Sequence, residues 1–217
     1  MENLDLTEQE EKIKENFISL TSDLGEVAFD SLLKDGIFRD FPIIGPILSS
    51  IKLGKSAYDY LLAIRLLKFI ESLEIKSENE INEFKERYFK IDDYPEIGSK
   101  ILLILEKIDD EIKIQWLAKS LLLLLDKKIN KTEFLRISSI INSVIPTDAQ
   151  KIEVFNQQER ITSTNDLIET YVLDHLYSVG LLSTAGFDGG NASGDNAGTV
   201  FIINEFGELF LRDLFKK

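Results

Sequence analysis

Apolar residues recur at helical spacing along most of the chain, a pattern typical of helices that bury one face. In the N-terminal part, five apolar residues step by four and three positions and form a short heptad-like seam. This pattern predicts a helix over roughly residues 8 to 34 that is closed by Gly36. We interpret the seam as an interaction surface. Its residues are Ile13, Phe17, Leu20, Leu24 and Val27.

The middle of the chain predicts four or more helices joined by short loops, which together form a helical bundle. One of these helices has start signals in the pair Asp109–Asp110, and Thr132 is expected to cap the next one. Leu123 and Leu124 lie outside the apolar stripe of their helix, so we expect this helix to be central and buried nearly all round. The predicted inward-facing residues are Leu62, Leu66, Phe69, Ile70 and Leu73; Ile81, Phe84 and Tyr88; Ile97, Ile101, Ile104, Leu105 and Ile108; Ile114, Leu117, Ala118, Leu121, Leu122 and Leu125; and Phe134, Ile137, Ile141 and Val144.

The last third of the chain has a different pattern. A predicted helix ends at Gly180 and is followed by two β-like runs, residues 181–187 and 199–203, on either side of a loop rich in Gly and Asn. Asn204 then caps a closing helix. The apolar residues of the two helices are Tyr171, Val172, Leu176 and Val179, and then Phe206, Leu209, Phe210 and Leu214. The order of helix, hairpin and helix is that of a winged-helix tail.

The predicted fold class is therefore mostly α: a helical bundle with a C-terminal winged-helix-like subdomain that carries a small β-hairpin. The chain has 217 residues, 44% of them hydrophobic, which is enough to bury a sizeable core. We expect residues 1–35 to form an acidic N-terminal helix, residues 36–147 the bundle and residues 148–217 the winged-helix-like subdomain.

Charge is unevenly distributed along the chain. In total, 25 Lys and Arg face 38 Asp and Glu, giving a net charge of -13. Residues 1–35 carry 3 basic and 10 acidic side chains, whereas residues 36–70 carry 5 basic and 2 acidic ones. The most apolar stretch is thus also the basic one, while the remaining surface opposes attraction to nucleic acid or anionic lipid.

Residues 36–70 allow two interpretations. A basic, apolar stretch punctuated by Pro and Gly can lie on a membrane surface or contact a partner; alternatively, it is the buried hinge and first core helix of the bundle. Its longest charge-free run, residues 41–51, has about half of the roughly 20 residues that a spanning helix needs. We assign membrane or partner contact to Phe38, Phe41, Ile43, Ile44, Ile47, Leu48, Lys52 and Lys55.

No catalytic, cofactor or metal site is predicted. The chain has no cysteine and one histidine, His175, which argues against thiolate or multi-histidine chemistry. Residues 54–56 read Gly-Lys-Ser, but position 49 is not the glycine of a phosphate-binding loop. The loop of residues 188–196 lacks the spacing of a calcium loop, and the pairs Asp92–Asp93 and Asp109–Asp110 fit helix starts better than acid and base roles. We therefore expect no enzyme.

The winged-helix tail raises the question of DNA binding. A recognition helix needs Arg, Lys, Asn or Gln to contact bases and phosphates. Residues 165–179 carry Asp166, Glu169 and Asp174 and have no Lys or Arg. Such a helix repels phosphate, so we interpret the tail as a module for protein interaction or dimerisation.

Three strings occur in a familiar order: F-P-I-I-G-P-I-L before an L-L-x-F-I-x-x-L helix; residues 98–113 before a leucine-rich helix and F-L-R-I-S-S-I-I; and an L-Y-S-V-G-L-L tail. Over roughly residues 36 to 215 the chain resembles small bacterial proteins grouped as abortive-infection alpha-type, found near phage-defence loci. The resemblance implies a role in phage defence, by damage to the host's own membrane or by sensing a phage component. It carries no functional residue with it.

The leading hypothesis is a non-enzymatic cytoplasmic protein that acts through a protein partner or as a homo-oligomer, in phage defence by abortive infection. The second is a membrane-active effector that uses residues 36–70 at the inner face of the membrane. The third is a transcription regulator. We expect no cofactor, no small-molecule substrate and no nucleic-acid partner.

We predict that the acidic N-terminal helix shields the basic segment, because residues 1–35 have a net charge of -7 and residues 36–70 one of +3. Deleting residues 1–35 should raise binding to anionic vesicles in co-sedimentation, with neutral vesicles as the control. Unchanged membrane affinity and unchanged toxicity to the host would contradict the shield.

Overall fold

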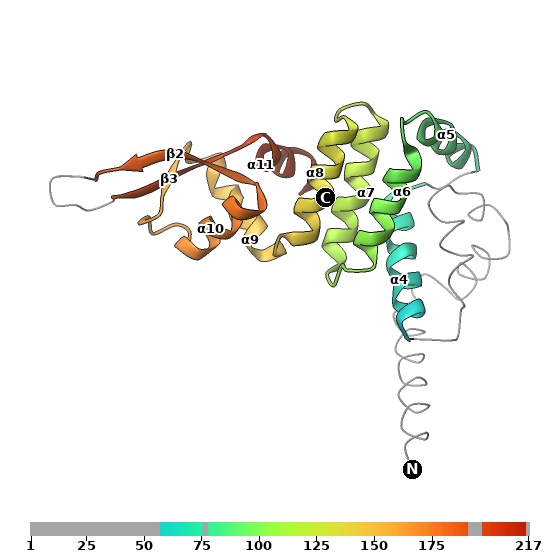
Figure 1. The fold of residues 1–217 in the computed structure, drawn as a ribbon, viewed down its shortest axis with the longest axis horizontal. Helices are drawn as coiled ribbons and strands as arrows, with labels where there is room; N and C mark the ends of the chain where they lie inside the picture. Colours follow the sequence, from blue (N-terminus) through green and yellow to red (C-terminus); the bar gives the residue numbers. More distant parts are fainter. Residues whose placement is uncertain (1–56, 76–77, 191–196, 216–217) are drawn as a thin grey trace, which may run out of the picture. The chain divides into compact units, whose positions relative to one another are not determined.

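The computed structural model describes residues 57–75, 78–190 and 197–215 (Figure 1). These residues are mostly helical, with a small antiparallel sheet near the C-terminus, which confirms the predicted fold class. The chain divides into two compact units, Met1–Glu106 and Lys107–Lys217. The expected domain boundaries at residues 35 and 147 stay predictions. The seam of residues 13–27 and the contact residues between Phe38 and Lys55 lie outside the described residues.

In the first unit, the described residues form α4 (Ala57–Ser72), α5 (Glu78–Phe89) and α6 (Tyr94–Leu105). The apolar stripes predicted for these helices are buried, so the helical periodicity identified the core correctly. The described end of the basic segment, residues 57–70, forms most of α4 and contributes Leu62, Leu66 and Phe69 to this core.

Arg65 links two helices of this unit. Its Nη1 donates hydrogen bonds to the carbonyl oxygens of Leu105, at 3.2 Å, and Glu106, at 2.8 Å. These carbonyl groups lie at the C-terminal end of α6, where no further helical turn supplies N–H donors for them. A guanidinium there also complements the negative end of the helix dipole. Arg65, one of the basic residues of segment 36–70, therefore has a structural role.

Four aromatic side chains gather where α5 turns into α6. Phe84 stacks on Tyr88 with ring centroids 6.1 Å apart, and Tyr94 meets both Tyr88 and Phe89 edge to face. The Tyr88 ring is fully buried, and its hydroxyl donates to the carbonyl oxygen of Tyr94 at 2.7 Å. Burial raises the pKa of Tyr88 well above its ordinary value, because the phenolate would lose its hydration.

The second unit begins with α7 (Glu111–Leu125) and α8 (Lys131–Ser143), which pack against each other. Asp110 caps α7 by accepting from the Ile112 amide, as expected for the pair of aspartates. The prediction for α8 was wrong: Asn130, not Thr132, caps this helix, in a reciprocal capping box with Glu133. Asn accepts from a free N-terminal amide as well as Thr does, so residue type alone did not locate the cap.

Helix α7 is buried nearly all round, as predicted for the leucine-rich helix. Its Trp116 ring meets the rings of Phe210 and Phe215 at centroid distances of 5.7 and 5.3 Å. Lys119 on the same helix donates to the carbonyl oxygen of Leu214 at 3.1 Å. The end of the described chain is therefore held on the central helix of this unit.

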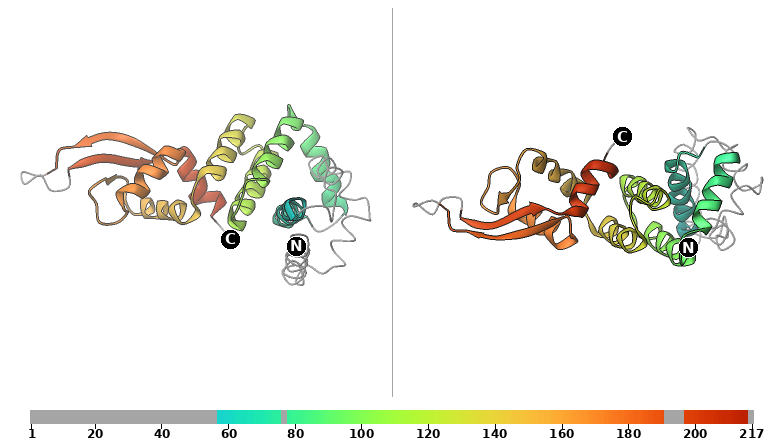
Figure 2. Two further views of the ribbon diagram at one scale, coloured as in Figure 1. Left: turned by 60° about the horizontal axis from the view of Figure 1, so that its bottom comes forward. Right: turned by 90° about the horizontal axis from the view of Figure 1, so that it is seen from above.

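After α8 follow α9 (Pro146–Gln150), the 3-10 helix η1 (Lys151–Asn156), β1 (Ile161–Thr162), α10 (Thr170–Val179), β2 (Leu182–Asp188), β3 (Gly198–Ile203), α11 (Glu205–Leu209) and a π-helical turn, η2 (Phe210–Leu214). The strands form one antiparallel sheet in the order β1-β3-β2. Figure 2 shows the hairpin of β2 and β3 running past α10. The predicted hairpin is confirmed, whereas β1 and the short helices α9 and η1 were not expected.

We predict that replacing Tyr88 by phenylalanine lowers stability by about 1 kcal/mol, the usual worth of one hydrogen bond. The raised pKa of Tyr88 adds a pH dependence: an unfolded tyrosine ionises near pH 10, whereas the buried one stays neutral, so folding stability falls as the pH rises above about 10. Thermal unfolding of Tyr88→Phe should show a smaller fall over this range than the parent. Tyr171→Phe, which removes an exposed hydroxyl, is the control; identical pH profiles for Tyr88→Phe and the parent would contradict the prediction.

Candidate protein-interaction site

Asn165 organises the loop that precedes α10. Its Oδ1 accepts hydrogen bonds from the amides of Leu167, at 2.6 Å, and Ile168, at 2.8 Å. Its Nδ2 donates to the carbonyl oxygens of Thr162 and Ile168. An asparagine that binds its neighbours' backbone in this way fixes a turn. Four hydrogen bonds of the Asn165 side chain thus hold the loop before α10, whose side chains Asp166, Leu167 and Glu169 face solvent while Ile168 is buried.

Helix α10 has a buried and an exposed side. Val172, Leu173 and Leu176 are buried. On the other side Tyr171 is 69% exposed and Tyr177 48%, with the exposed Asp174 between them in sequence. Residues three apart are neighbours on a helix surface, so two aromatic rings flank one carboxylate.

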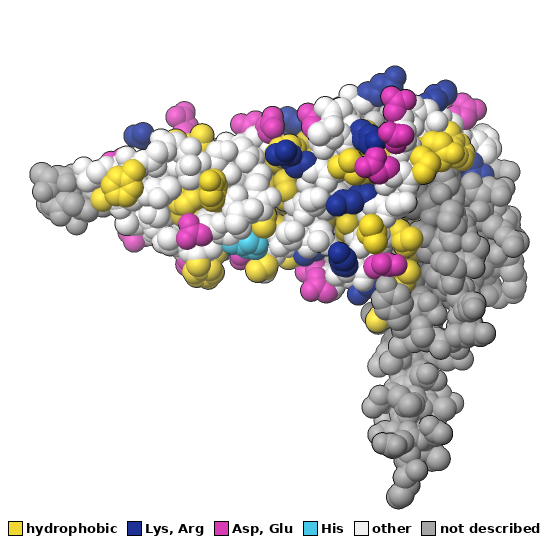
Figure 3. Space-filling view, in the orientation of Figure 1, with side chains coloured by type: hydrophobic (Ala, Val, Ile, Leu, Met, Phe, Trp, Pro, Cys, Tyr) yellow, Lys and Arg dark blue, Asp and Glu magenta, His cyan; other side chains and the backbone are white. Residues whose placement is uncertain are grey.

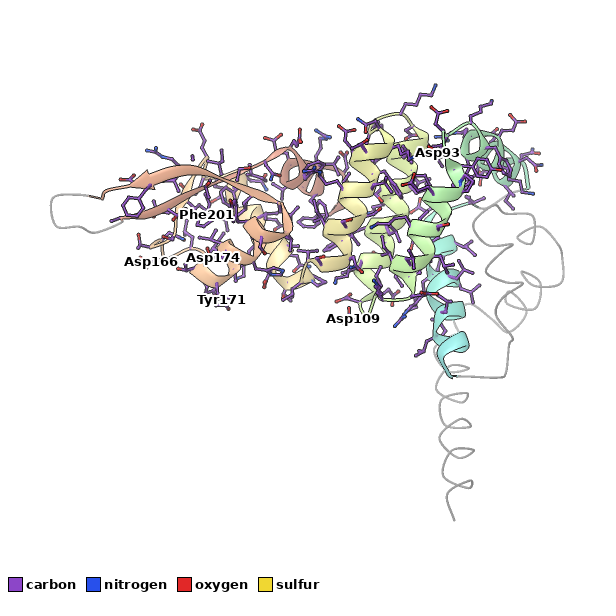
Figure 4. All side chains as sticks on the ribbon, viewed as in Figure 1. Asp93, Asp109, Asp166, Tyr171, Asp174 and Phe201 are labelled. Atoms are coloured by element: carbon purple, nitrogen blue, oxygen red, sulfur yellow. The ribbon has the colours of Figure 1, made fainter. Side chains whose placement is uncertain are left out.

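The preceding loop extends this exposed side. Leu167 is 54% exposed, and the carboxylates of Asp166 and Glu169 are exposed next to it in sequence. We use the name α10 face for the following six residues: Asp166, Leu167, Glu169, Tyr171, Asp174 and Tyr177. Figure 4 labels Asp166, Tyr171 and Asp174, which lie on and just before α10.

Contacts with two other elements and a glycine at its end hold α10 in place. Asp148 of α9 contacts His175, with Oδ2 and Nδ1 2.5 Å apart. The Tyr177 ring packs edge to face on Phe201 of β3, with centroids 6.2 Å apart. At the other end of the helix, Gly180 adopts φ 92°, a left-handed conformation that glycine tolerates best. The α10 face is therefore presented by a fixed helix.

Asn204 joins the end of α10 to α11. Its Oδ1 accepts from the amides of Phe206 and Gly207, and its Nδ2 donates to the Gly180 carbonyl oxygen at 2.9 Å. Gly207 lies so close to this junction that a Cβ there would sit 2.4 Å from the Leu181 carbonyl oxygen. The backbone of α11 therefore contacts the backbone that follows α10, and a side chain larger than that of glycine at position 207 would clash there.

The stretch of sequence that forms the α10 face and the hairpin has acidic side chains and no Lys or Arg, and Arg160 directly precedes it. Residues 161–211 contain no Lys and no Arg over 51 positions. Over α10 and the hairpin, the space-filling view shows acidic and apolar side chains close to one another (Figure 3). This part of the unit repels phosphate and attracts positive charge. The acidic residues in this range are Asp166, Glu169, Asp174, Asp188, Asp195, Glu205 and Glu208.

The hairpin adds a further exposed aromatic residue. The pairing of β2 with β3 is irregular between Thr184 and Phe187, and Gly186 has φ 104°. Such a bulge changes where neighbouring side chains point. Phe187 is 74% exposed, so this strand presents an apolar ring to solvent.

The aspartates and the histidine that were candidates for chemistry in the sequence lie at turns, at helix starts or in contacts between helices. Asp93 precedes α6 in a left-handed conformation and makes no side-chain cap bond. Asp188 accepts from the Gly190 amide at 3.0 Å, an arrangement typical of a turn. Residues 54–56 lie outside the described residues. His175 contacts Asp148, which ties α10 to α9.

The sequence pattern did not identify the α10 face as a site. Tyr171 was grouped with the apolar residues of its helix, and only the structure shows that it is exposed. One signal was available: Asp174 follows Tyr171 by three positions, so a helix places both on one side. The lack of Lys and Arg in residues 165–179 extends to the hairpin.

In residues 57–75, 78–190 and 197–215, no three His, Asp or Glu side chains gather in a way that could hold a metal ion. Among the same residues, no helix has the length and apolar character needed to cross a membrane.

Comparison of the chain with protein-family models, with curated proteins and with solved structures finds no match.

We predict that Gly207→Ala destabilises the second unit by about 1–3 kcal/mol, the usual cost of forcing an extra methyl group into packed structure. The added methyl would meet the Leu181 carbonyl and Cγ1 of Ile203, 2.6 Å away. Gly189→Ala is the matched control, because nothing lies within 4 Å of a Cβ at that position. Equal thermal unfolding temperatures for both variants would show that the junction is not tightly packed.

Proposed function

We propose that this protein is a non-enzymatic interaction protein that acts through a protein partner in bacterial phage defence. The observation that carries the proposal is the α10 face, where two tyrosines and a leucine are exposed among carboxylates. Tyrosine is enriched at protein interfaces, because its ring buries a large area while its hydroxyl can still bind water or a partner.

Rigidity supports this use of the α10 face. Asn165 fixes the loop before the helix, and Asn204 fixes the turn after it. A surface that is already ordered loses less conformational entropy when a partner binds. The exposed tyrosines therefore lie on a helix suited to recognition.

Nucleic acid is disfavoured as the partner of this unit. In winged helices that read DNA, a helix enters the major groove and basic side chains contact phosphate. Here α10 and the hairpin have carboxylates and no Lys or Arg. A transcription regulator that binds DNA through this unit would have to overcome that repulsion.

The membrane-active alternative uses residues 36–70, of which residues 36–56 lie outside the described residues. In the following stretch, residues 57–70, Leu62, Leu66, Phe69 and Ile70 are buried in the core of the first unit, whereas Leu61 is exposed. Self-assembly through the seam of residues 13–27 stays a prediction. Phage defence rests on the resemblance of residues 36 to 215 to abortive-infection alpha-type proteins, and it calls for a direct test.

The test is protection of a bacterial culture. Cells that express the full-length chain should form at least about tenfold fewer plaques than vector controls with at least one phage of a diverse panel. Tyr171→Ala should abolish this protection, because an exposed tyrosine at the centre of an interface often carries more than 1 kcal/mol of binding energy.

Leu103→Ala is the matched control, since Leu103 is 52% exposed on α6 of the first unit. Both variants should unfold at temperatures close to that of the parent, because exposed substitutions change stability by about 0.5 kcal/mol or less. No protection against any phage of the panel would contradict the role in defence. Protection retained by Tyr171→Ala would contradict the use of the α10 face.

A further inference from the structure

The three carboxylates of the α10 face have no basic partner within the described residues. Asp166, Glu169 and Asp174 are exposed, and the ion pairs found in the described part of the chain do not involve them. The sequence around them supplies no Lys or Arg between residues 161 and 211. Their negative charge is therefore not neutralised by their own unit and is free to act on a partner.

Tyr171 and Tyr177 indicate which positively charged side chains the partner presents. A Lys or Arg side chain can lay its aliphatic stem along an aromatic ring while its charged end reaches a carboxylate. Tyr171 and Asp174 are three residues apart, and so are Asp174 and Tyr177. Neighbours at this spacing have Cβ atoms about 5–6 Å apart. A cation above either ring gains cation–π attraction and lies within reach of Asp174.

Other occupants fit this face less well. Nucleic acid is repelled by the carboxylates, and the described acidic residues do not form a group of three that could hold a metal ion. A second copy of the chain has a net charge of -13, and its one basic stretch, residues 36–70, has a net charge of only +3, so two whole copies repel each other at low ionic strength. Charge complementarity therefore points to a different protein with an excess of positive charge.

We infer that the α10 face binds a segment of another protein that is rich in Lys and Arg and also carries apolar side chains. This inference rests on the proposed function, because it names the chemistry of the partner that the α10 face takes. Leu167, which is 54% exposed, receives the apolar side chains of the segment. The carboxylates and the tyrosines receive its cations.

The experiment uses the full-length protein and two fluorescein-labelled peptides, one of alternating Arg and Leu and one of alternating Glu and Leu. Fluorescence anisotropy should show binding of the first peptide and not of the second. Binding should weaken as salt is raised, because exposed charges are screened. A labelled DNA duplex, which should not bind, is the third probe.

A pair of triple variants separates this surface from the overall negative charge. Asp166→Asn, Glu169→Gln and Asp174→Asn together should weaken binding of the Arg and Leu peptide by at least about tenfold, since each exposed ion pair contributes a modest amount. Glu83→Gln, Glu86→Gln and Asp92→Asn remove the same three charges from exposed positions in the first unit. This control should change binding by less than about twofold.

Tyr171→Ala should weaken binding of the same peptide by at least about fivefold, whereas Leu103→Ala should leave it unchanged. Equal losses in the two triple variants, or no binding of the Arg and Leu peptide, would overturn the inference. Binding of the DNA duplex by the parent protein would also overturn it.

Failure of this inference can be distinguished from failure of the proposed function. If the peptide does not bind but phage protection still depends on Tyr171, the partner is not basic and the proposed function stands. If the peptide binds as expected but no phage is restricted, the basic partner stands and the role in defence is wrong.

Discussion

The second unit depends on the close approach of α11 to the junction between α10 and β2. Asn204 binds the carbonyl oxygen of Gly180 and caps α11 with the same side chain, while Gly207 leaves room for the Leu181 carbonyl. Because two backbone segments are in direct contact here, no side chain can change rotamer to relieve a clash. It sets where α10 ends, where β2 begins and how the last apolar residues reach Trp116 on α7.

This constraint also determines what α10 can present. With Leu173 and Leu176 buried, the opposite side of the helix must face solvent, and that side carries Tyr171 and Asp174. Exposing large aromatic rings is unfavourable for an isolated protein, so an interaction accounts better than folding does for the two exposed tyrosines of this helix. The neighbouring carboxylates keep such a surface soluble while it is unoccupied, because like charges repel copies of the chain.

Several features of the fold could be predicted from residue types and spacing alone. Gly180 ends α10, Asn204 caps α11, and the apolar stripe of α7 is central, because each depends on local conformation or on helical periodicity. The cap of α8 was misplaced by two residues, since Asn130 and Thr132 are both good caps and the reciprocal bonds with Glu133 are made by Asn130. Strand β1 is two residues long and has no pattern of its own, so only its pairing with β3 identifies it.

For the candidate site, too, some features follow from the sequence and others only from the tertiary structure. The sequence by itself determined the helix, its acidic residues and the lack of Lys and Arg, because composition and local spacing do not depend on what packs against the helix. Only the tertiary structure decided that Tyr171 faces solvent and Val172 does not. The two residues are adjacent and both apolar in character, and their environments differ because β2 and α9 pack against α10 and bury Val172, while Tyr171 stays exposed.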